Sequence, residues 1–331
     1  MNKSVTFKII TSLSLVSLLF FNIPQVFAEE ASVSSTSPLE AVVTSTRELI
    51  AEPAIRVGLY KSQDGVSFVS DSSYQVFSGV QLFGALAAGD TASLSYTGGL
   101  YHFNSSELNF DSPHFFRLAP EDATSFFTIT NYNRRLSGRK NNFNTYRGAL
   151  EYRFSPKSKL PYIINELPLD SYVAGIAESS DSVPTEYAKA LLVAARSYAY
   201  AMLGTSPSEK HLFDVYATTQ DQLYLGYNSE ISMPNIAATA HATAGQMVTH
   251  QGKPVVTPYF SHSNGKTKTW PSKTRPWLKS VVASYDKGKK MLGHGYGMSN
   301  RDASLHAGKD GWTYDEILKH YYSGTEVEKI Y

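Results

Sequence analysis

The chain has 331 residues, of which 42% are hydrophobic and 13% aromatic, so it can fill the cores of two ordinary domains. Its 30 basic and 29 acidic residues nearly cancel to a formal charge of +1, which excludes a global basic field for nucleic acid, and we expect no nucleic-acid partner. It contains no cysteine, which excludes disulfides, lipid attachment through cysteine and thiolate metal sites.

The first residues have the order of a secretory signal peptide. Lys3 and Lys8 precede an apolar run from Ile9 to Phe21, and Pro24 and small residues up to Ala28 follow. This order predicts a signal peptide over residues 1–28, with cleavage after Ala28. The run is too short to cross a hydrocarbon core of about 30 Å comfortably. We therefore expect a secreted protein without a stable membrane span, an uncleaved anchor being the alternative.

Two segments of different composition follow. Residues 29–52 are rich in Ala, Ser, Thr, Val and Glu and lack aromatic residues, which predicts a flexible linker. Residues 53–145 alternate short apolar runs with Gly, Asp, Ser and Asn turn signals, which is typical of a strand-rich region. The runs are Ile55 to Tyr60, Val66 to Val69, Tyr74 to Val80 and Phe126 to Ile129.

Helical periodicity appears only later in the chain. From Pro184 to about Leu203 apolar residues recur at three- and four-residue steps, which predicts a helix with one apolar stripe. A second helix is expected from Tyr314 to about Tyr322, with Gly324 as its stop. The stripe of the first helix consists of Ala188, Leu191, Leu192, Ala195, Tyr198, Ala199 and Met202.

A series of short blocks from residue 146 onward resembles, in the same order, the blocks of the SpoIID/LytB family (stage II sporulation protein D-like, amidase enhancer domain). The blocks are Tyr146 to Gly148, Asn165 to Tyr172, Gly175 to Glu178, Lys189 to Ala199, Gln222 to Gly226, Ala242 to Gly245, Tyr259 to Thr267, Trp277 to Val281, Gly293 to Ser299 and Ile317 to Tyr322. The resemblance covers residues 146–331 and implies a mixed α/β domain there. With the strand-rich region it predicts an α+β fold.

The resemblance implies a substrate class and leaves two activities open. Family members are either lytic transglycosylases that cut peptidoglycan glycan strands or enhancers of N-acetylmuramoyl-L-alanine amidases. The expected partners are therefore glycan strands and, under the second alternative, a cell-wall amidase. After export such a protein is expected to be associated with the cell wall, in sporulation or in general wall turnover.

Glu178 is the candidate catalytic residue. A lytic transglycosylase needs one carboxylic acid, which protonates the glycosidic oxygen and whose conjugate base then takes the proton from the sugar's O6. Glu178 ends the Gly-Ile-Ala-Glu block, near the place of the family's active-site glutamate, and Ile176, Val183 and tyrosines are available as an apolar wall. Two alternatives remain: Glu178 caps the following turn, or a different gap placement sets Ser180 opposite the acid.

Eight further residues in the blocks are candidates for substrate binding. For Arg196 a structural ion pair is the alternative, for Tyr224 a place in the core, and for the glycine-rich stretch around His294 a purely conformational turn. The serines and the threonine belong to polar turns, where loops often carry binding groups. The candidates are Arg196, Gln222, Tyr224, Ser261, Ser263, Thr267, His294 and Ser299.

Several chemistries have no motif in this sequence. No HExxH, close His spacing or Cys pair occurs, so we expect no metal, and without GxGxxG or GxxxxGK[ST] we expect no nucleotide cofactor. Without GxSxG a serine hydrolase is disfavoured. Departures from the family pattern at Asp170, Asn264, Asn300 and Asp302 favour the enhancer alternative, because a side chain at Asp302 is expected to interfere if that position needs glycine.

Overall fold

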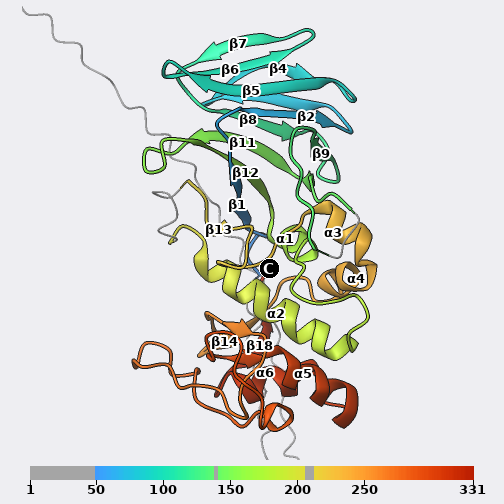
Figure 1. Cartoon of the computed structure of the whole chain (residues 1–331), viewed down its shortest axis with the longest axis vertical. Coiled ribbons are helices and arrows are strands. Elements are labelled where there is room, and N and C mark those ends of the chain that lie inside the picture. Colours follow the sequence, from blue (N-terminus) through green and yellow to red (C-terminus); the bar gives the residue numbers. More distant parts are fainter. Residues whose placement is uncertain (1–48, 138–140, 206–211) are drawn as a thin grey trace, which may run out of the picture. The chain divides into compact units, whose positions relative to one another are not determined.

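The computed structural model describes residues 49–137, 141–205 and 212–331. The expected signal peptide and all but the last four residues of the expected linker lie outside these ranges. Within them the chain is α+β, as expected, with a strand-rich first part and helices in the second (Figure 1). No helix in these ranges is both long and apolar enough to cross a bilayer.

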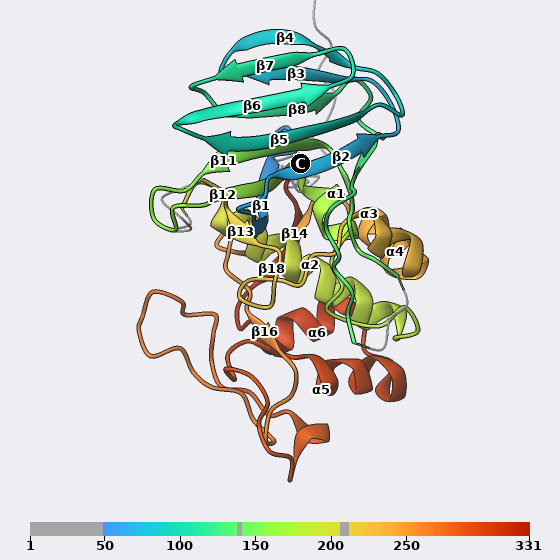
Figure 2. The same ribbon diagram turned by 45° about the horizontal axis from the view of Figure 1, so that its top comes forward.

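Most strands precede the first long helix and form two sheets. One has seven strands in the order β13-β1-β12-β11-β8-β3-β4 and the other six in the order β10-β9-β2-β5-β6-β7 (Figure 2). The strands are β1 Ala54–Lys61, β2 Val66–Ser70, β3 Tyr74–Ser78, β4 Gln81–Leu86, β5 Thr91–Thr97, β6 Leu100–Ser105, β7 Asn109–Ser112, β8 Phe116–Pro120, β9 Phe126–Ile129, β10 Thr145–Arg147, β11 Ala149–Phe154, β12 Pro161–Pro168 and β13 Val215–Tyr216.

The inward faces of the two sheets contribute to one core. β2 and β3 each alternate buried and half-buried residues, the period of a strand with one face on a core. Phe68 and Phe103 from the six-stranded sheet are buried in the same apolar cluster as Val57, Phe116 and Tyr152 from the seven-stranded sheet. The four predicted runs thus correspond to β1, β2, β3 and β9.

The expected boundary between residues 145 and 146 does not coincide with a break in the seven-stranded sheet. β1 pairs antiparallel with β12 from Ala54 opposite Pro168 to Lys61 opposite Tyr162. β11 pairs with both β12 and β8. Strands from before and after residue 146 are therefore interleaved in one sheet.

α2 is the central helix, and it packs against two apolar cores. The helices are α1 Leu169–Ala174, α2 Thr185–Met202, α3 Tyr227–Ser232, α4 Pro234–Ala242, α5 Asn300–Leu305 and α6 Tyr314–Tyr321, so both predicted helices are confirmed. In α2, Ala188 and Leu192 pack into the core shared with the sheets, whereas Leu191 and Ala194 pack into a second core with Ile317 of α6. A helix apolar on nearly all sides suits such a central position.

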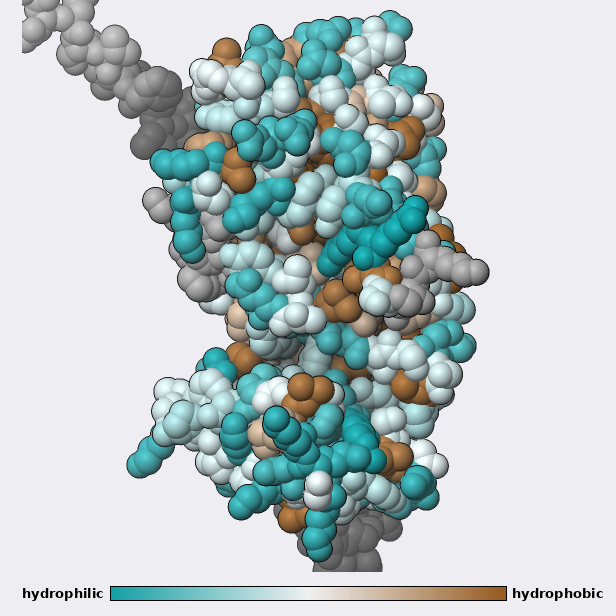
Figure 3. Space-filling view, viewed as in Figure 1, coloured by the Kyte–Doolittle hydropathy of each residue, from teal (hydrophilic) through white to brown (hydrophobic). Residues whose placement is uncertain are grey.

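The second core belongs to the C-terminal part. Its small sheets are β15-β14-β18 and β16-β17, with β14 Gln246–His250, β15 Lys253–Pro254, β16 Tyr259–Phe260, β17 Met298–Ser299 and β18 Glu326–Lys329. α6 begins with a capping box between Thr313 and Glu316, which satisfies two N–H groups of its first turn. On the face shown in Figure 3, hydrophobic residues are scattered among hydrophilic ones and form no continuous apolar surface.

Candidate active site

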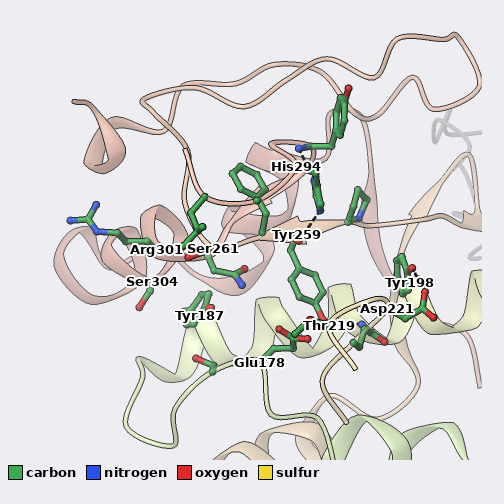
Figure 4. Close-up of a pocket in the computed structure, with 18 of the residues that line it drawn as sticks. Glu178, Tyr187, Tyr198, Thr219, Asp221, Tyr259, Ser261, His294, Arg301 and Ser304 are labelled. Carbon is green, nitrogen blue, oxygen red and sulfur yellow. Dashed lines mark hydrogen bonds between the residues drawn. The ribbon is translucent and has the colours of Figure 1, made fainter. Parts of the chain in front are cut away.

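A cavity of about 1100 Å³ lies between α2 and the long loops of the C-terminal part. Glu178, Tyr187 and Tyr198 line it from the α2 side, and Tyr259 and His294 from the other (Figure 4). The volume suits a ligand larger than a monosaccharide. The cavity is the candidate site because it contains Glu178, the residue predicted to carry the chemistry.

Backbone contacts hold Glu178 at the cavity wall. The segment after α1 runs beside residues 222–225, where Ala177 N–H donates to Leu223 O at 2.8 Å and Leu223 N–H donates to the Glu178 carboxylate at 2.5 Å. Gly175 permits this approach, since a Cβ there would come within 2.5 Å of the Tyr224 ring. The position of Glu178 is thus determined by the neighbouring segment of residues 222–225.

The surroundings of Glu178 change its acidity. Burial raises the pKa of the Glu178 carboxyl, and the hydrogen bond from Leu223 N–H lowers it again in part. Val183 and the rings of Tyr187 and Tyr259 supply the apolar wall, whereas Ile176 is buried in the core away from it. The carboxyl therefore stays protonated to a higher pH than an exposed one, while an N–H group is in place for its ionised form.

Gln222 is hydrogen-bonded to the phenol of Tyr259. Its side chain is buried; Tyr172 Oη donates to its Oε1 at 2.9 Å, and its Nε2 donates to Tyr259 Oη at 2.9 Å and to Ala195 O at 3.2 Å. Burial, followed by the nearby charge of Glu178, raises the pKa of Tyr259 well above its usual value. Tyr259 is a neutral phenol that accepts from Gln222 and keeps its own proton for a partner in the cavity.

His294 presents a neutral ring to the cavity. Its Nδ1 accepts from Tyr296 N–H at 3.0 Å, so its Nε2 carries the proton and donates to Tyr259 O at 3.1 Å. Burial lowers the pKa of His294, in agreement with a neutral imidazole. Both nitrogens are occupied, so the ring offers its face and edge and no free acid or metal-binding atom. Among the described residues no cluster of His, Asp and Glu is placed to hold a metal.

Four of the nine predicted site residues line the cavity. They are Glu178, Gln222, Ser261 and His294. The other five, Arg196, Tyr224, Ser263, Thr267 and Ser299, are buried with protein partners and do not line it. For these five the expectation of ligand contact is corrected to a role in the fold.

Arg196 connects three elements from the middle of α2. Its guanidinium is fully buried, forms an ion pair with Asp170 of α1 at 2.6 Å, and donates to Ala240 O of α4 at 3.0 Å and to Gln246 O of β14 at 3.2 Å. This is the structural ion pair that the sequence left open as an alternative. The planar fork of arginine suits three acceptors in different directions.

Ser263 and Ser299 meet at a buried carboxylate. Ser263 N–H and Ser299 Oγ–H both donate to one oxygen of Asp286, at 2.8 Å and 2.5 Å, and Arg301 pairs with the other oxygen at 3.1 Å. These bonds join the loops on the far side of the cavity. Neither serine has a hydroxyl left that reaches a ligand.

Tyr224 and Thr267 are also committed to the fold. Tyr224 Oη donates to Asn165 Oδ1 at 2.8 Å, and its ring stacks on Tyr172 at 5.0 Å between centroids. Thr267 Oγ1 accepts from Val281 N–H at 3.0 Å. The core alternative given for Tyr224 is the one that the structure shows.

Asp302 is accommodated inside a helix. It lies in α5, where it accepts from Tyr321 Oη at 2.5 Å and from Tyr285 N–H at 2.7 Å. The position needs no glycine, so this departure from the family pattern leaves the local fold intact.

Sequence reasoning missed several residues of the cavity. Tyr259 begins the block Tyr259 to Thr267, and an aromatic residue beside the candidate serines of this block is a usable signal for the cavity wall. Trp270 and Arg275 belong to a polar loop without periodicity, and no local signal places them opposite α2. Asp221 also lines the cavity, with its two oxygens bonded to Tyr198 Oη and Tyr216 N–H, both at 2.8 Å.

Comparison with known families identifies the class of this domain. Residues 158–250, which include α1, Glu178 and all of α2, match the model of the family described as SpoIID, stage II sporulation protein. This part of the chain is therefore similar to the SpoIID family.

Two of the relatives are sporulation proteins by name. The chain is 27% identical over 163 residues to stage II sporulation protein D of Bacillus subtilis (strain 168), covering 43% of this chain and 47% of that protein. It is 28% identical over 144 residues to stage II sporulation protein D of Bacillus amyloliquefaciens, covering 38% of this chain and 41% of that protein. The chain thus spans less than half the length of these relatives.

Proposed function

We propose that this protein is an exported, wall-associated enzyme that cleaves peptidoglycan glycan strands by lytic transglycosylase chemistry, with Glu178 as general acid and then base. The observation that carries the proposal is a carboxyl group with a raised pKa in the wall of a saccharide-sized cavity. The names of the relatives indicate sporulation as the process.

The chemistry follows from one carboxyl group. Protonated Glu178 gives its proton to the glycosidic oxygen, and the bond from that oxygen to C1 of the muramoyl residue breaks. The carboxylate then takes the proton from the same sugar's O6 hydroxyl while O6 bonds to C1 and closes a 1,6-anhydro ring. Glu178 ends in its starting state, and no water is consumed. Leu223 N–H supports the carboxylate between the two transfers.

The second carboxylate of the cavity does not suggest hydrolysis. Hydrolytic glycosidases use two carboxyl groups, one of which serves as nucleophile or activates water. Both oxygens of Asp221 already accept hydrogen bonds from Tyr198 and Tyr216. Glu178 remains as the group with a raised pKa and a free second oxygen.

The proposal is tested on the full secreted chain with isolated peptidoglycan, and the products are analysed by mass spectrometry. We expect fragments with 1,6-anhydromuramoyl ends, and a loss of rate of about 100-fold or more in Glu178→Gln. Ser180→Ala is the matched control and should retain the wild-type rate, because Ser180 bonds to Ser182 and does not line the cavity.

Intact strands, or full activity of Glu178→Gln, would overturn the assigned role. Adding a cell-wall amidase to the same reactions examines the alternative. An enhancer increases the release of stem peptides only in the mixture, and that stimulation persists in Glu178→Gln.

A further inference from the structure

A row of aromatic rings in the cavity wall ends at a cation. Phe260 contacts His294 with centroids 5.4 Å apart, His294 stacks on Tyr296 at 6.0 Å, and Tyr296 meets Trp270 edge-on at 4.9 Å. The guanidinium of Arg275 lies 4.2 Å over the Trp270 ring. All five residues line the cavity, and we call the four rings, those of Phe260, His294, Tyr296 and Trp270, the ring row.

Arg275 is held in place without a carboxylate. It is half-buried, and none of the ion pairs within residues 49–137, 141–205 and 212–331 includes it. Its backbone carbonyl accepts from Leu278 N–H at 3.0 Å, and Trp270 N–H donates to Leu278 O at 2.8 Å, so the loop closes on itself beneath the stacked pair. The guanidinium is therefore preorganised with its N–H groups available.

The neighbouring cations are already occupied. Arg301, which also lines the cavity, pairs with Asp286 at 3.1 Å and donates to Tyr285 O. Lys268, beside the ring row, donates to His294 O at 3.0 Å. Arg275 is thus the cavity cation that the described part of the chain leaves without an anion.

We propose that Arg275 is a specificity-determining residue that binds a carboxylate on the saccharide lying against the ring row. The inference rests on the proposed function, because it names the feature of the glycan that the same cavity selects. Aromatic faces contact the apolar faces of sugar rings, and the planar fork of a guanidinium matches a carboxylate with two parallel hydrogen bonds. In peptidoglycan such a carboxylate belongs either to the lactyl group of a muramoyl residue or to its stem peptide.

The inference is tested by binding in the full chain carrying Glu178→Gln, which prevents cleavage. The probes are a neutral β-1,4-linked N-acetylglucosamine tetrasaccharide and glycan tetrasaccharides with free lactyl carboxylates, with amidated lactyl groups, and with stem peptides whose acids are free or amidated. Titration calorimetry gives the affinities. We expect probes with a free carboxylate to bind about tenfold more tightly than their neutral counterparts.

Substitutions at residue 275 and a matched control distinguish the effect of the Arg275 charge from the effect of any change in the same loop. Arg275→Gln should bring the ratio of charged to neutral affinity to about one, and Arg275→Lys should keep part of it, because it retains the charge and loses the fork. Lys273→Gln removes an exposed cation from the same loop outside the cavity and should leave the ratio unchanged. The lactyl and peptide probes show which carboxylate is recognised, and preference for either supports the inference.

The inference is overturned if charged and neutral probes bind equally, or if Arg275→Gln weakens both classes by the same factor. Its failure differs from failure of the proposed function, since binding needs no cleavage. Glycan cleavage without carboxylate preference overturns only the role of Arg275. Carboxylate preference without cleavage overturns only the enzymatic role.

Discussion

Glu178 combines burial with a titratable charge, and this combination affects the stability of the protein. Its folded-state pKa is raised, so the folded protein binds the proton more tightly than the unfolded chain does. Below the pKa of the unfolded chain both states are protonated, and ionisation of Glu178 does not change the free energy of unfolding. As the pH rises through the folded pKa, an ionised group must stay buried, and the folded state loses stability relative to a non-titrating variant.

We therefore expect Glu178→Gln to gain stability relative to the wild type as the pH rises above about 4.5, the ordinary pKa of a glutamate, as measured by chemical denaturation. Glu186→Gln is the control with the opposite sign. Although burial acts to raise the pKa of Glu186, bonds from Lys189 and Tyr314 N–H lower it overall, so its contribution is present at neutral pH and is lost in acid. Parallel pH profiles for the two variants would contradict the assigned environment of Glu178.

α2 is the element that connects the two cores, and Arg196 is its main polar contact with its neighbours. The side chain is completely buried, and its three acceptors belong to α1, α4 and the beginning of β14. Removing it leaves the carboxylate of Asp170 without its cation and takes one donor from each of two carbonyls, Ala240 O and Gln246 O. Such losses are severe when the groups are out of reach of water.

Arg196→Met is expected to lower the free energy of unfolding by about 3–5 kcal/mol in chemical denaturation. Arg196→Lys should fall between this variant and the wild type, because it keeps the charge and cannot reach all three acceptors. Lys189→Met on the same helix removes a partly exposed ion pair with Glu186 and should change stability by less than about 1 kcal/mol. A stable Arg196→Met protein with impaired glycan binding would favour the original ligand-binding prediction.

At the scale of the whole molecule, the strand-rich region of residues 53–145 and residues 146–331 share a sheet. β1 lies between β12 and β13, and β8 lies beside β11, so a fragment of residues 146–331 leaves β12 and β11 each with an unpaired edge. Buried residues of these strands, such as Ile163 and Tyr152, lose their cover at the same time. Exposed edges with apolar faces promote aggregation.

We expect the fragment of residues 146–331 to aggregate or to lack a cooperative thermal transition in circular dichroism, whereas residues 49–331 melt cooperatively. The comparison isolates the contribution of the first strands, since both fragments contain every described helix and the whole cavity. A cooperative transition in the shorter fragment would show that the region after residue 145 is an independent domain.

Sequence periodicity by itself determined α2, α6 and four of the strands. Apolar side chains that face a core recur every three or four residues on a helix and every two residues on a strand, so the pattern is visible within a single element. The order of the blocks made Glu178 the candidate catalytic residue, and the structure places it in the wall of the cavity. Only the tertiary structure decided that Arg196, Ser263 and Ser299 support the fold and that Arg275 faces the same cavity as Glu178. Arg196 bonds to residues 26 to 50 positions away, and Ser263 and Ser299 bond to a carboxylate 23 and 13 positions away. Local patterns carry no signal for such contacts.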